Sequence, residues 1–390
     1  YVNQFKCVEW QRRLCFRYYL SYASRSFEQM ERYIDALVQE LQMYSRRPNV
    51  RERKVRFVYF GGGTPSVLSG ARIEKLLSGL ERVLPWDEVK EVTYECSPKT
   101  VTREKMEVLR QAGVTRISLG VQQLNDEVLG KNGRVHLVKD VEFAYSTIRQ
   151  VGFEVVNLDL MVGLLGETDT SFEKSLERTI AMAPDSVTIY QLEMPKNTPL
   201  YQKYSSDRLH ESPASWQVKR QRLRRAFARL DAAGYPLRSA YTAVRNGRPR
   251  QFIYQDDQYH GADLLGLGAS AFSYLGGIHF QNLTSLSSYL QCVTEARAPV
   301  ERIYCLSGEE QLIREFILQL KLGRIERAYF LQKFSIDVFD RFAPELARVE
   351  AAGLLVRNEH GLELTPAGFL RVDEILPVFY LPEHQGVRYS

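Results

Sequence analysis

Three consecutive glycines are the feature of this sequence that points most directly to a ligand. Gly61, Gly62 and Gly63 follow an apolar run at 55–60 and precede Thr64. Glycines directly after a buried strand let the backbone approach a ligand closely and present its N–H and C=O groups. A tight turn usually needs only one glycine, so three favour a binding loop. The segment matches neither the Walker loop nor the G-x-G-x-x-G fingerprint, so phosphate and dinucleotide sites are poor fits.

Polar side chains recur near the ends of the later apolar runs. They are Glu95, Gln122, Arg134 and Asp159. Burying a carboxylate such as Asp159, which lies inside the run NLDLM, is costly without a partner. One such residue often only caps a helix. Four at equivalent positions predict a site for a ligand that carries hydroxyl, amine and carboxylate groups.

Strands and helices alternate over residues 25–205 in the order that would position these side chains. The strands are continuously apolar, as expected for a parallel sheet covered by helices. We predict strands at 55–60, 92–95, 116–121, 155–162 and 186–192, and helices at 71–84, 103–113 and 171–182. Successive β–α units of this kind favour an α/β fold with a partial (β/α)6-type barrel, in which functional residues gather at the carboxyl ends of the strands.

We expect three regions along the chain: a β/α barrel core at 1–205, a barrel extension on the substrate side at 206–305, and a winged-helix-like, α-rich domain at 306–390. The segment 215–234 predicts an amphipathic helix whose basic residues either contact phosphate or, as is commoner, form a solvated face. The last region has three helices and a hairpin in the order of a winged helix. Its third helix is acidic, with Asp340, Glu345 and Glu350, which argues against DNA binding.

The composition is that of a soluble globular protein. The chain has 390 residues, of which 44% are apolar, and its 52 basic and 47 acidic residues give a net charge of +5. This small excess predicts neither a nucleic-acid nor a membrane partner. Five scattered cysteines suit a reducing cytoplasm. The most membrane-like window, 261–278, is rich in glycine and predicts a buried strand and turn.

Six motifs together resemble a known family. In chain order they are FVYFGGGTPS, GVTRISLGVQ, GRVH, NLDLMVGLLGET, DSVTIYQLEMPKNT and LPEHQGVRY. Over nearly its whole length the chain resembles the radical S-adenosylmethionine superfamily, in the branch around oxygen-independent coproporphyrinogen III oxidase. Within this branch it looks most similar to the oxidase-like methyltransferases and cyclopropanases.

The resemblance implies a cofactor contact for each of the residues singled out above. Residues 61–64 match the loop that holds the methionyl amine of S-adenosylmethionine, and the four polar residues match side chains that line its methionyl and ribose groups. Tyr190 and Leu192 match the strand beside the adenine. Gly266 and Gly268 fall where relatives bring the backbone near a second S-adenosylmethionine or the substrate.

The same resemblance implies cofactors, partners and a reaction. The chain would bind one or two molecules of S-adenosylmethionine. A 4Fe–4S cluster would donate an electron to one of them and release a 5′-deoxyadenosyl radical that abstracts hydrogen. The cofactor performs the difficult chemistry while the protein positions it and excludes water. We expect a small-molecule substrate, an electron donor such as flavodoxin or ferredoxin, and a separate methyltransferase as a further partner. We expect no nucleic acid and no membrane.

The cluster ligands are the one place where the family pattern breaks. The family uses C-x3-C-x2-C, whose thiolates hold the iron, whereas only Cys7 and Cys15 lie in the expected region. Alignment on the first residues makes Cys7 a ligand and puts Gln11 and Leu14 at the other positions. Alignment backward from the helix that follows places the last ligand at Arg17, and it does not find three cysteines either.

Three explanations of this break stay open. The chain could be a cluster-less member that still binds S-adenosylmethionine, or a distant thiol such as Cys96 could complete the site. The third explanation is that residues 1–22 differ from those of the natural protein. The intact cofactor motifs favour the third, because drift after loss of the cluster should have eroded them too.

The function we expect is methylation or cyclopropanation of an unsaturated carbon in a secondary metabolite by a cytoplasmic enzyme. The first alternative is oxidative decarboxylation of the coproporphyrinogen III oxidase type. The second is a cluster-less carrier of haem and S-adenosylmethionine on the same scaffold. A winged-helix regulator is a third, which the acidic helix argues against.

Overall fold

The structure is a computed structural model that describes residues 13–19, 27–193, 213–248 and 252–385, with only the backbone described for 13–19. The sequence-predicted positions Cys7 and Gln11 lie outside this part of the chain. The chain divides into two compact units. Unit 1 consists of Tyr1–Ile117, Thr147–Glu154 and Gln251–Ser307, and unit 2 consists of Ser118–Ser146, Val155–Arg250 and Gly308–Ser390.

Unit 1 is built on a mixed sheet with the strand order β11-β10-β9-β8-β1-β2-β3. Strands β8, β1, β2 and β3 are parallel, whereas β9, β10 and β11 are antiparallel. The strands are β1 (Arg13–Tyr19), β2 (Lys54–Gly61), β3 (Glu91–Cys96), β8 (Asp263–Leu267), β9 (Phe272–Leu275), β10 (Ile278–Asn282) and β11 (Val300–Cys305). Because the parallel strands share a direction, the loops after β8, β1, β2 and β3 leave from one edge of the sheet.

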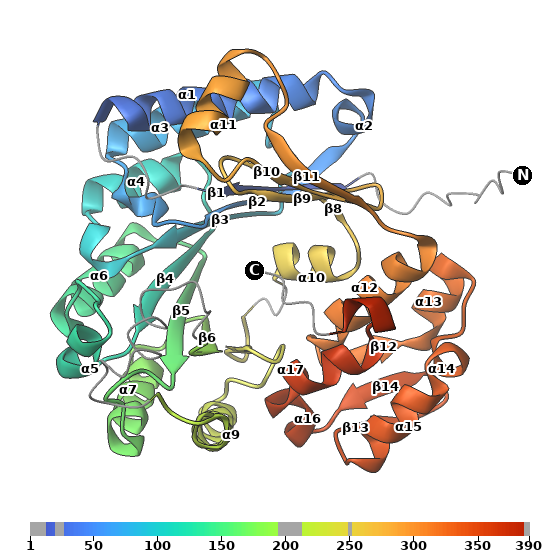
Figure 1. Cartoon of the computed structure of the whole chain (residues 1–390). Helices are drawn as coiled ribbons and strands as arrows, with labels where there is room; N and C mark the ends of the chain where they lie inside the picture. The colour runs from blue at the N-terminus through green and yellow to red at the C-terminus, as the bar shows by residue number, and fades with distance from the viewer. Residues whose placement is uncertain (1–12, 20–26, 194–212, 249–251, 386–390) are drawn as a thin grey trace, which may run out of the picture. The chain divides into compact units, whose positions relative to one another are not determined.

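The helices of unit 1 cover its sheet unequally. Figure 1 shows α1, α3 and α11 on one face of these strands and the short helix α10 on the other. The helices are α1 (Phe27–Ser45), α2 (Pro48–Arg51), α3 (Gly70–Val83), α4 (Arg103–Gln111), α10 (Ile253–Tyr259) and α11 (Leu286–Thr294). On the α10 face, Phe57, Leu264 and Tyr274 form an apolar cluster with Tyr59 and Tyr254 at its border.

Unit 2 continues the β–α alternation. Its strands are β4 (Arg116–Gln122), whose first two residues belong to unit 1, β5 (Val155–Val162), β6 (Ser186–Gln191) and β7 (Thr242–Val244), in that order. Strands β5 and β6 are parallel and β7 is antiparallel to β6. The helices that accompany them are α5 (Asp126–Lys131), α6 (Val138–Val151), whose residues 147–151 belong to unit 1, α7 (Asp169–Ala181) and α9 (Trp216–Ala232).

The C-terminal part of unit 2 has the order expected of a winged helix. Its elements are α12 (Gly308–Leu320), β12 (Arg324–Glu326), α13 (Arg327–Phe334), α14 (Val338–Arg341), α15 (Ala343–Ala351), β13 (Leu355–Arg357), β14 (Gly361–Leu364), α16 (Pro366–Leu370) and α17 (Val372–Ile375). The three strands form a small sheet in the order β12-β14-β13. Phe316, Phe330, Phe342 and Phe379 pack together at the centre of its core.

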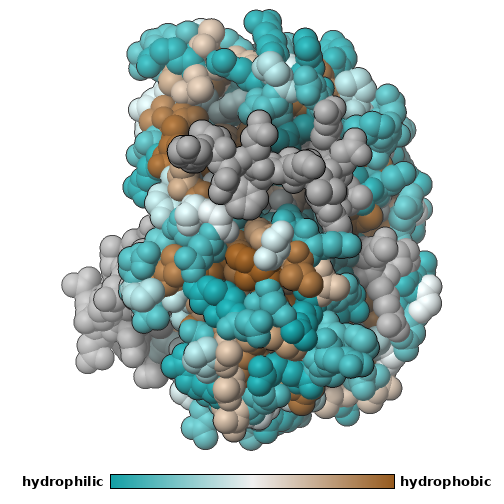
Figure 2. Space-filling view, turned by 90° about the vertical axis from the view of Figure 1, so that its right-hand side faces the viewer, coloured by the Kyte–Doolittle hydropathy of each residue, from teal (hydrophilic) through white to brown (hydrophobic). Residues whose placement is uncertain are grey.

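The predicted α/β class is confirmed, because the five predicted strands appear as β2 to β6 and the three predicted helices as α3, α4 and α7. The ends differ slightly, as element ends usually do. The membrane-like window 261–278 forms β8, β9 and their turns. Within the described part of the chain, no helix has the length and apolarity that a bilayer crossing requires. The face in Figure 2 is largely hydrophilic, with separate hydrophobic areas.

Candidate functional site

The glycine loop after β2 lies against a carboxylate from β3. The Tyr59 hydroxyl donates a hydrogen bond of 2.5 Å to Glu95 Oε1, and the Gly62 N–H donates one of 3.3 Å to Glu95 Oε2. A Cβ at Gly61 would lie 2.6 Å from Glu95 Oε1 and from the Tyr59 ring, and Gly62 has a φ of 101°. Only glycine fits both positions without displacing a neighbour. The predicted loop and Glu95 therefore form one constellation.

Tyr59 is a member of this constellation that sequence reasoning missed. Its ring also packs against Tyr254 of α10, with 4.9 Å between the centroids. The signal was present, because Tyr59 and Gly61 are two residues apart on one strand and so share a face. What the sequence could not show is that Glu95 points to the same place.

The sequence that follows β1 contains no thiolate ligand for an iron–sulfur cluster. Tyr19 pairs with Gly61, so β1 and β2 end beside each other at the same sheet edge. The sequence between β1 and α1, residues 20–26, is LSYASRS and contains no cysteine, histidine or carboxylate. Cys15 belongs to β1 itself, and Cys7 precedes β1 in the sequence. In parallel β/α folds the ligand-holding residues follow the strands, whereas Cys15 lies near the start of β1.

Cys96 does not complete a cluster site. Its side chain is buried at the end of β3, with 4% exposed, and burial raises the pKa of its thiol to about 12. Leu14 and Arg17, which the two alignments placed at ligand positions, lie inside β1. Among the described residues, no three His, Cys, Asp or Glu side chains are grouped to hold a metal ion.

The second predicted glycine loop, after β8, is closed by the protein itself. The Gly266 N–H donates to Ser273 Oγ at 3.0 Å, and the Gly268 N–H donates to Glu40 Oε2 at 2.9 Å. Glu40 is fully buried and also accepts hydrogen bonds of 2.7 Å from Asn282 and from Tyr289. These two amides are therefore already used inside unit 1.

In unit 2, Gln122 is the last residue of β4, whereas Asp159 lies in the middle of β5 and not at its end. Asp159 accepts hydrogen bonds of 2.8 Å from Ser118 Oγ and from Asn157 Nδ2, which are the partners that a half-buried carboxylate needs. Gln122 adopts a φ of 64°, a strained value for a residue with a side chain. Its Oε1 is buried and accepts no hydrogen bond from the described residues. A polar ligand would satisfy this oxygen.

The remaining predicted residues of unit 2 are more exposed. Tyr190 is 45% exposed and stacks on Tyr241 with 6.4 Å between ring centroids. Leu192 donates its N–H to Val162 O at 2.9 Å and accepts a 2.9 Å hydrogen bond from Lys219 Nζ. Arg134 is exposed on the loop after α5. Between Tyr190 and Leu192, the side-chain oxygen of Gln191 is a second buried oxygen with no partner among the described residues.

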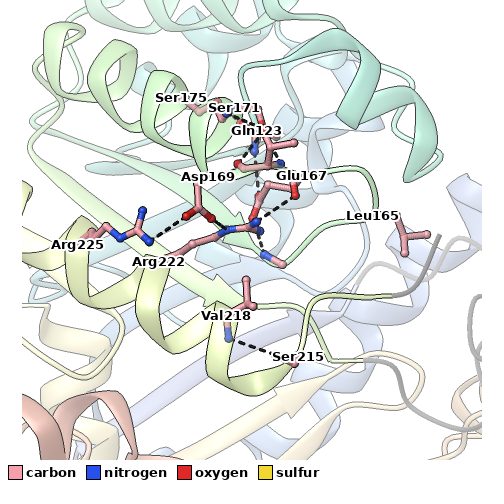
Figure 3. Close-up of polar contacts among 12 residues, drawn as sticks. Gln123, Leu165, Glu167, Asp169, Ser171, Ser175, Ser215, Val218, Arg222 and Arg225 are labelled. Carbon is pink, nitrogen blue, oxygen red and sulfur yellow. Dashed lines mark hydrogen bonds and ion pairs between the residues drawn. The ribbon is translucent and has the colours of Figure 1, made fainter.

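A buried ion pair holds the loops after β4 and β5. Figure 3 shows Arg222 and Gln123 converging on Glu167. Glu167 accepts from Gln123 Nε2 at 3.0 Å, from the Gly163 N–H at 2.8 Å and from Arg222 Nη1 at 2.7 Å. Burial raises the pKa of Glu167, and the Gly163 amide and Arg222 oppose that rise. The network keeps Gln123, and therefore Gln122 next to it, in place.

Several basic residues of α9 pair with acidic residues of α7, and the outermost of these pairs are solvent-exposed. Arg222 and Arg225 both pair with Asp169 at the start of α7, at 2.8 and 2.9 Å, and Arg229 pairs with Glu177 at 3.0 Å. The sequence showed the basic helix but not the acidic face of α7 that it meets. This helix therefore stabilises unit 2.

The described residues fit one cofactor of the predicted family and not the other. The glycine cradle beside the Glu95 carboxylate suits the charged amine of S-adenosylmethionine. The residues between β1 and α1 offer no thiolate for a 4Fe–4S cluster.

Comparison with known proteins decides the family. The model of the radical SAM superfamily matches residues 15–179, and that of the HemN C-terminal domain matches residues 306–371. The oxygen-independent coproporphyrinogen III oxidase of Pseudomonas aeruginosa is 30% identical over 92% of this chain and 81% of its own length. This chain belongs to the HemN group of the radical SAM superfamily. Members of this superfamily use a 4Fe–4S cluster and S-adenosylmethionine.

Two further relatives extend this picture of the HemN group. The heme chaperone HemW of Bacillus subtilis is 29% identical over 90% of this chain and 91% of its own length. The solved coproporphyrinogen III oxidase HemN of Escherichia coli superposes with a TM-score of 0.81, covering 95% of this chain and 90% of that one, at 25% identity. The partial-barrel fold is thereby confirmed. The predicted affinity to methyltransferases and cyclopropanases gains no support from these relatives.

Proposed function

We propose that this chain binds S-adenosylmethionine and carries haem, without cleaving S-adenosylmethionine to a radical. The observation that carries the proposal is the contrast between two adjoining strand ends. The loop after β2 keeps Gly61, Gly62 and the Glu95 contact, whereas residues 20–26 after β1 contain no thiol. A retained glycine loop without cluster ligands suits a binding role. HemW, whose name describes a heme chaperone, is similar to this chain over nearly its whole length.

A second candidate is oxidative decarboxylation of coproporphyrinogen III. The observation in its favour is that coproporphyrinogen III oxidases match this chain as fully as HemW does, with 30% identity to the Pseudomonas aeruginosa protein. It requires a cluster, and the ligands for one would have to come from residues outside the described part of the chain. Methylation or cyclopropanation of a secondary metabolite is the weakest of the three proposals, because none of the relatives above carries such a name.

The deciding experiment measures four quantities on the purified full chain after anaerobic reconstitution with iron and sulfide: bound iron, bound S-adenosylmethionine, release of 5′-deoxyadenosine with a reductant, and bound haem. The carrier proposal expects haem and S-adenosylmethionine to bind without cleavage. About four irons per chain with 5′-deoxyadenosine release would establish the oxidase candidate instead. The matched control is the Cys7→Ser, Cys15→Ser double variant, which should retain the same adventitious iron as the wild type. The coproporphyrinogen III oxidase of Escherichia coli serves as the positive control.

A further inference from the structure

The sheet of unit 1 has one face with an unusual set of side chains. His279 of β10 pairs with Tyr304 of β11 on one side and with Tyr274 of β9 on the other. Directly opposed residues of antiparallel strands share a face. The rings of His279 and Tyr274 are 4.8 Å apart, which confirms the shared face. Two residues further along β10, the same register pairs Gln281 with Arg302 of β11 and with Phe272 of β9.

This face points away from α1. Phe280, the neighbour of His279 in β10, packs against Tyr44 of α1 with 6.3 Å between ring centroids. Since successive side chains of a strand point to opposite faces, His279 points to the α10 side, which Figure 1 shows below the strands. Tyr304 is 51% exposed and Phe272 is 46% exposed, while His279 is half-buried and Arg302 exposed.

The face is continuous with the cofactor loop through an aromatic layer. Tyr274 belongs to the same apolar cluster as Phe57, and Tyr59 and Tyr254 border that cluster. Tyr59 in turn donates its hydrogen bond to Glu95, beside the glycine loop. A flat ligand on β9, β10 and β11 would therefore lie on the same face as the candidate S-adenosylmethionine site, within one unit.

We infer that this face binds the tetrapyrrole, with His279 as an axial ligand of the haem iron. Imidazole is a common haem ligand, and Tyr304 and Phe272 offer rings that stack on a flat macrocycle. Arg302 supplies a cation for a propionate carboxylate. Three neighbouring strands span about 10 Å, comparable with the width of the macrocycle. The inference deepens the proposed function and rests on it, because it names the residues that would hold the haem.

The test titrates the full chain with ferric haem and records the Soret spectrum of the protein-bound fraction after gel filtration. His279→Ala should weaken binding about tenfold, the loss of roughly one strong contact, and should change the Soret band. Added imidazole should restore the wild-type spectrum of the variant. Arg302→Ala should weaken binding about threefold, as for one exposed ion pair, and should bind haem and its dimethyl ester equally well.

Two matched variants keep the inference separate from the proposed function. Cys305→Ser removes an exposed thiol from the opposite face of β11, where it pairs with Ile278, and His360→Ala removes an exposed histidine from the β13–β14 hairpin. Both should bind haem as the wild type does. Normal binding by His279→Ala, or a loss confined to Cys305→Ser, would overturn the inference and leave the carrier function standing. A wild type that retains no haem would overturn the carrier function itself.

Discussion

Two glycine loops in unit 1 look alike in sequence and differ in the structure. Gly61 is the last residue of β2, and Gly266 lies in the parallel strand β8 just before Gly268, so both glycine segments leave the same sheet edge. In the first loop Gly62 is exposed and its N–H reaches the half-buried Glu95 at 3.3 Å. In the second loop the Gly268 N–H is bound at 2.9 Å by the fully buried Glu40.

The difference separates a strand end that can take a ligand from one that the protein has closed. Closure by a buried carboxyl group occurs again after β5, where Glu167 accepts the Gly163 N–H at 2.8 Å. Glu40 and Glu167 both lie fully inside their unit, whereas Glu95 is reached from the surface. A glycine-rich loop therefore indicates that the backbone comes close to another group. That group is a part of the chain itself where the acidic partner of the loop is buried, and a ligand where the acidic partner is accessible.

The largest effect that this comparison predicts concerns Glu167. Glu167→Ala leaves the buried Arg222 guanidinium and the Gly163 amide without their acceptor, and should lower the free energy of unfolding by about 3–5 kcal/mol. Glu177→Ala, which removes a surface ion pair with Arg229 of α9, should change the free energy of unfolding by less than about 1 kcal/mol. Urea denaturation measures both, and equal effects would show that the closed strand end contributes little.

Glu40 should make stability depend on pH. Burial raises the pKa of Glu40 from 4.5 to about 7, so the folded chain keeps this proton where the unfolded chain has lost it. The stabilisation is complete below pH 4.5 and is lost as the pH rises to 7. The free energy of unfolding should therefore fall by about 3 kcal/mol across this window.

The measurement for Glu40 is urea denaturation at several pH values for the wild type and for Glu40→Gln, a neutral side chain of similar shape. The free energy of unfolding of the variant should lack the decrease between pH 4.5 and 7. Identical slopes for the two proteins would mean that Glu40 is not held protonated and that the loop after β8 is closed in another way.

Gly266→Ala should lower the stability of the fold and leave the binding of S-adenosylmethionine unchanged. The added Cβ would lie 2.3 Å from the Phe272 carbonyl oxygen, a backbone atom that cannot swing aside, so the free energy of unfolding should fall by about 2–3 kcal/mol. Gly130→Ala is the control, since a Cβ there meets nothing within 4 Å. A stable Gly266→Ala variant that bound S-adenosylmethionine poorly would instead place a ligand at this loop.

Gly61→Ala should show the opposite pattern. The new Cβ would displace the Glu95 carboxylate and the Tyr59 ring, which are movable side chains, so S-adenosylmethionine should bind about tenfold more weakly while unfolding changes little. Equilibrium dialysis with labelled S-adenosylmethionine measures the affinity, and Gly308→Ala, at an open position, should bind normally. Unchanged affinity of Gly61→Ala would remove the glycine loop from the cofactor site.

Tyr59→Phe should have the smallest effect. It deletes the hydroxyl that donates to Glu95 and keeps the ring against Tyr254, so S-adenosylmethionine should bind about threefold more weakly, as for one hydrogen bond. The same dialysis applies. An effect as large as that of Gly61→Ala would show that Tyr59 touches the ligand directly and does not act only through Glu95.

The local pattern of residues determined much of this protein. Continuous apolar runs predicted β2 to β6, because buried parallel strands need apolar side chains on both faces, and the motif order predicted the radical SAM superfamily. The loop at 61–63 and Glu95 also followed from local signals. The basic helix α9 was recognised as well, but its pairing with Asp169 and Glu177 depends on residues about 50 positions away in the chain.

Only the tertiary structure decided which glycine loop is open. Glu40 lies 228 residues from Gly268, and no local pattern connects a helix near the start of the chain to a turn after β8. The tertiary structure likewise placed Cys15 inside β1. Residue types set the chemistry that a chain can perform, whereas long-range packing sets which groups meet. The reason is that burial and the charges of partners distant in sequence determine what each polar side chain can bind.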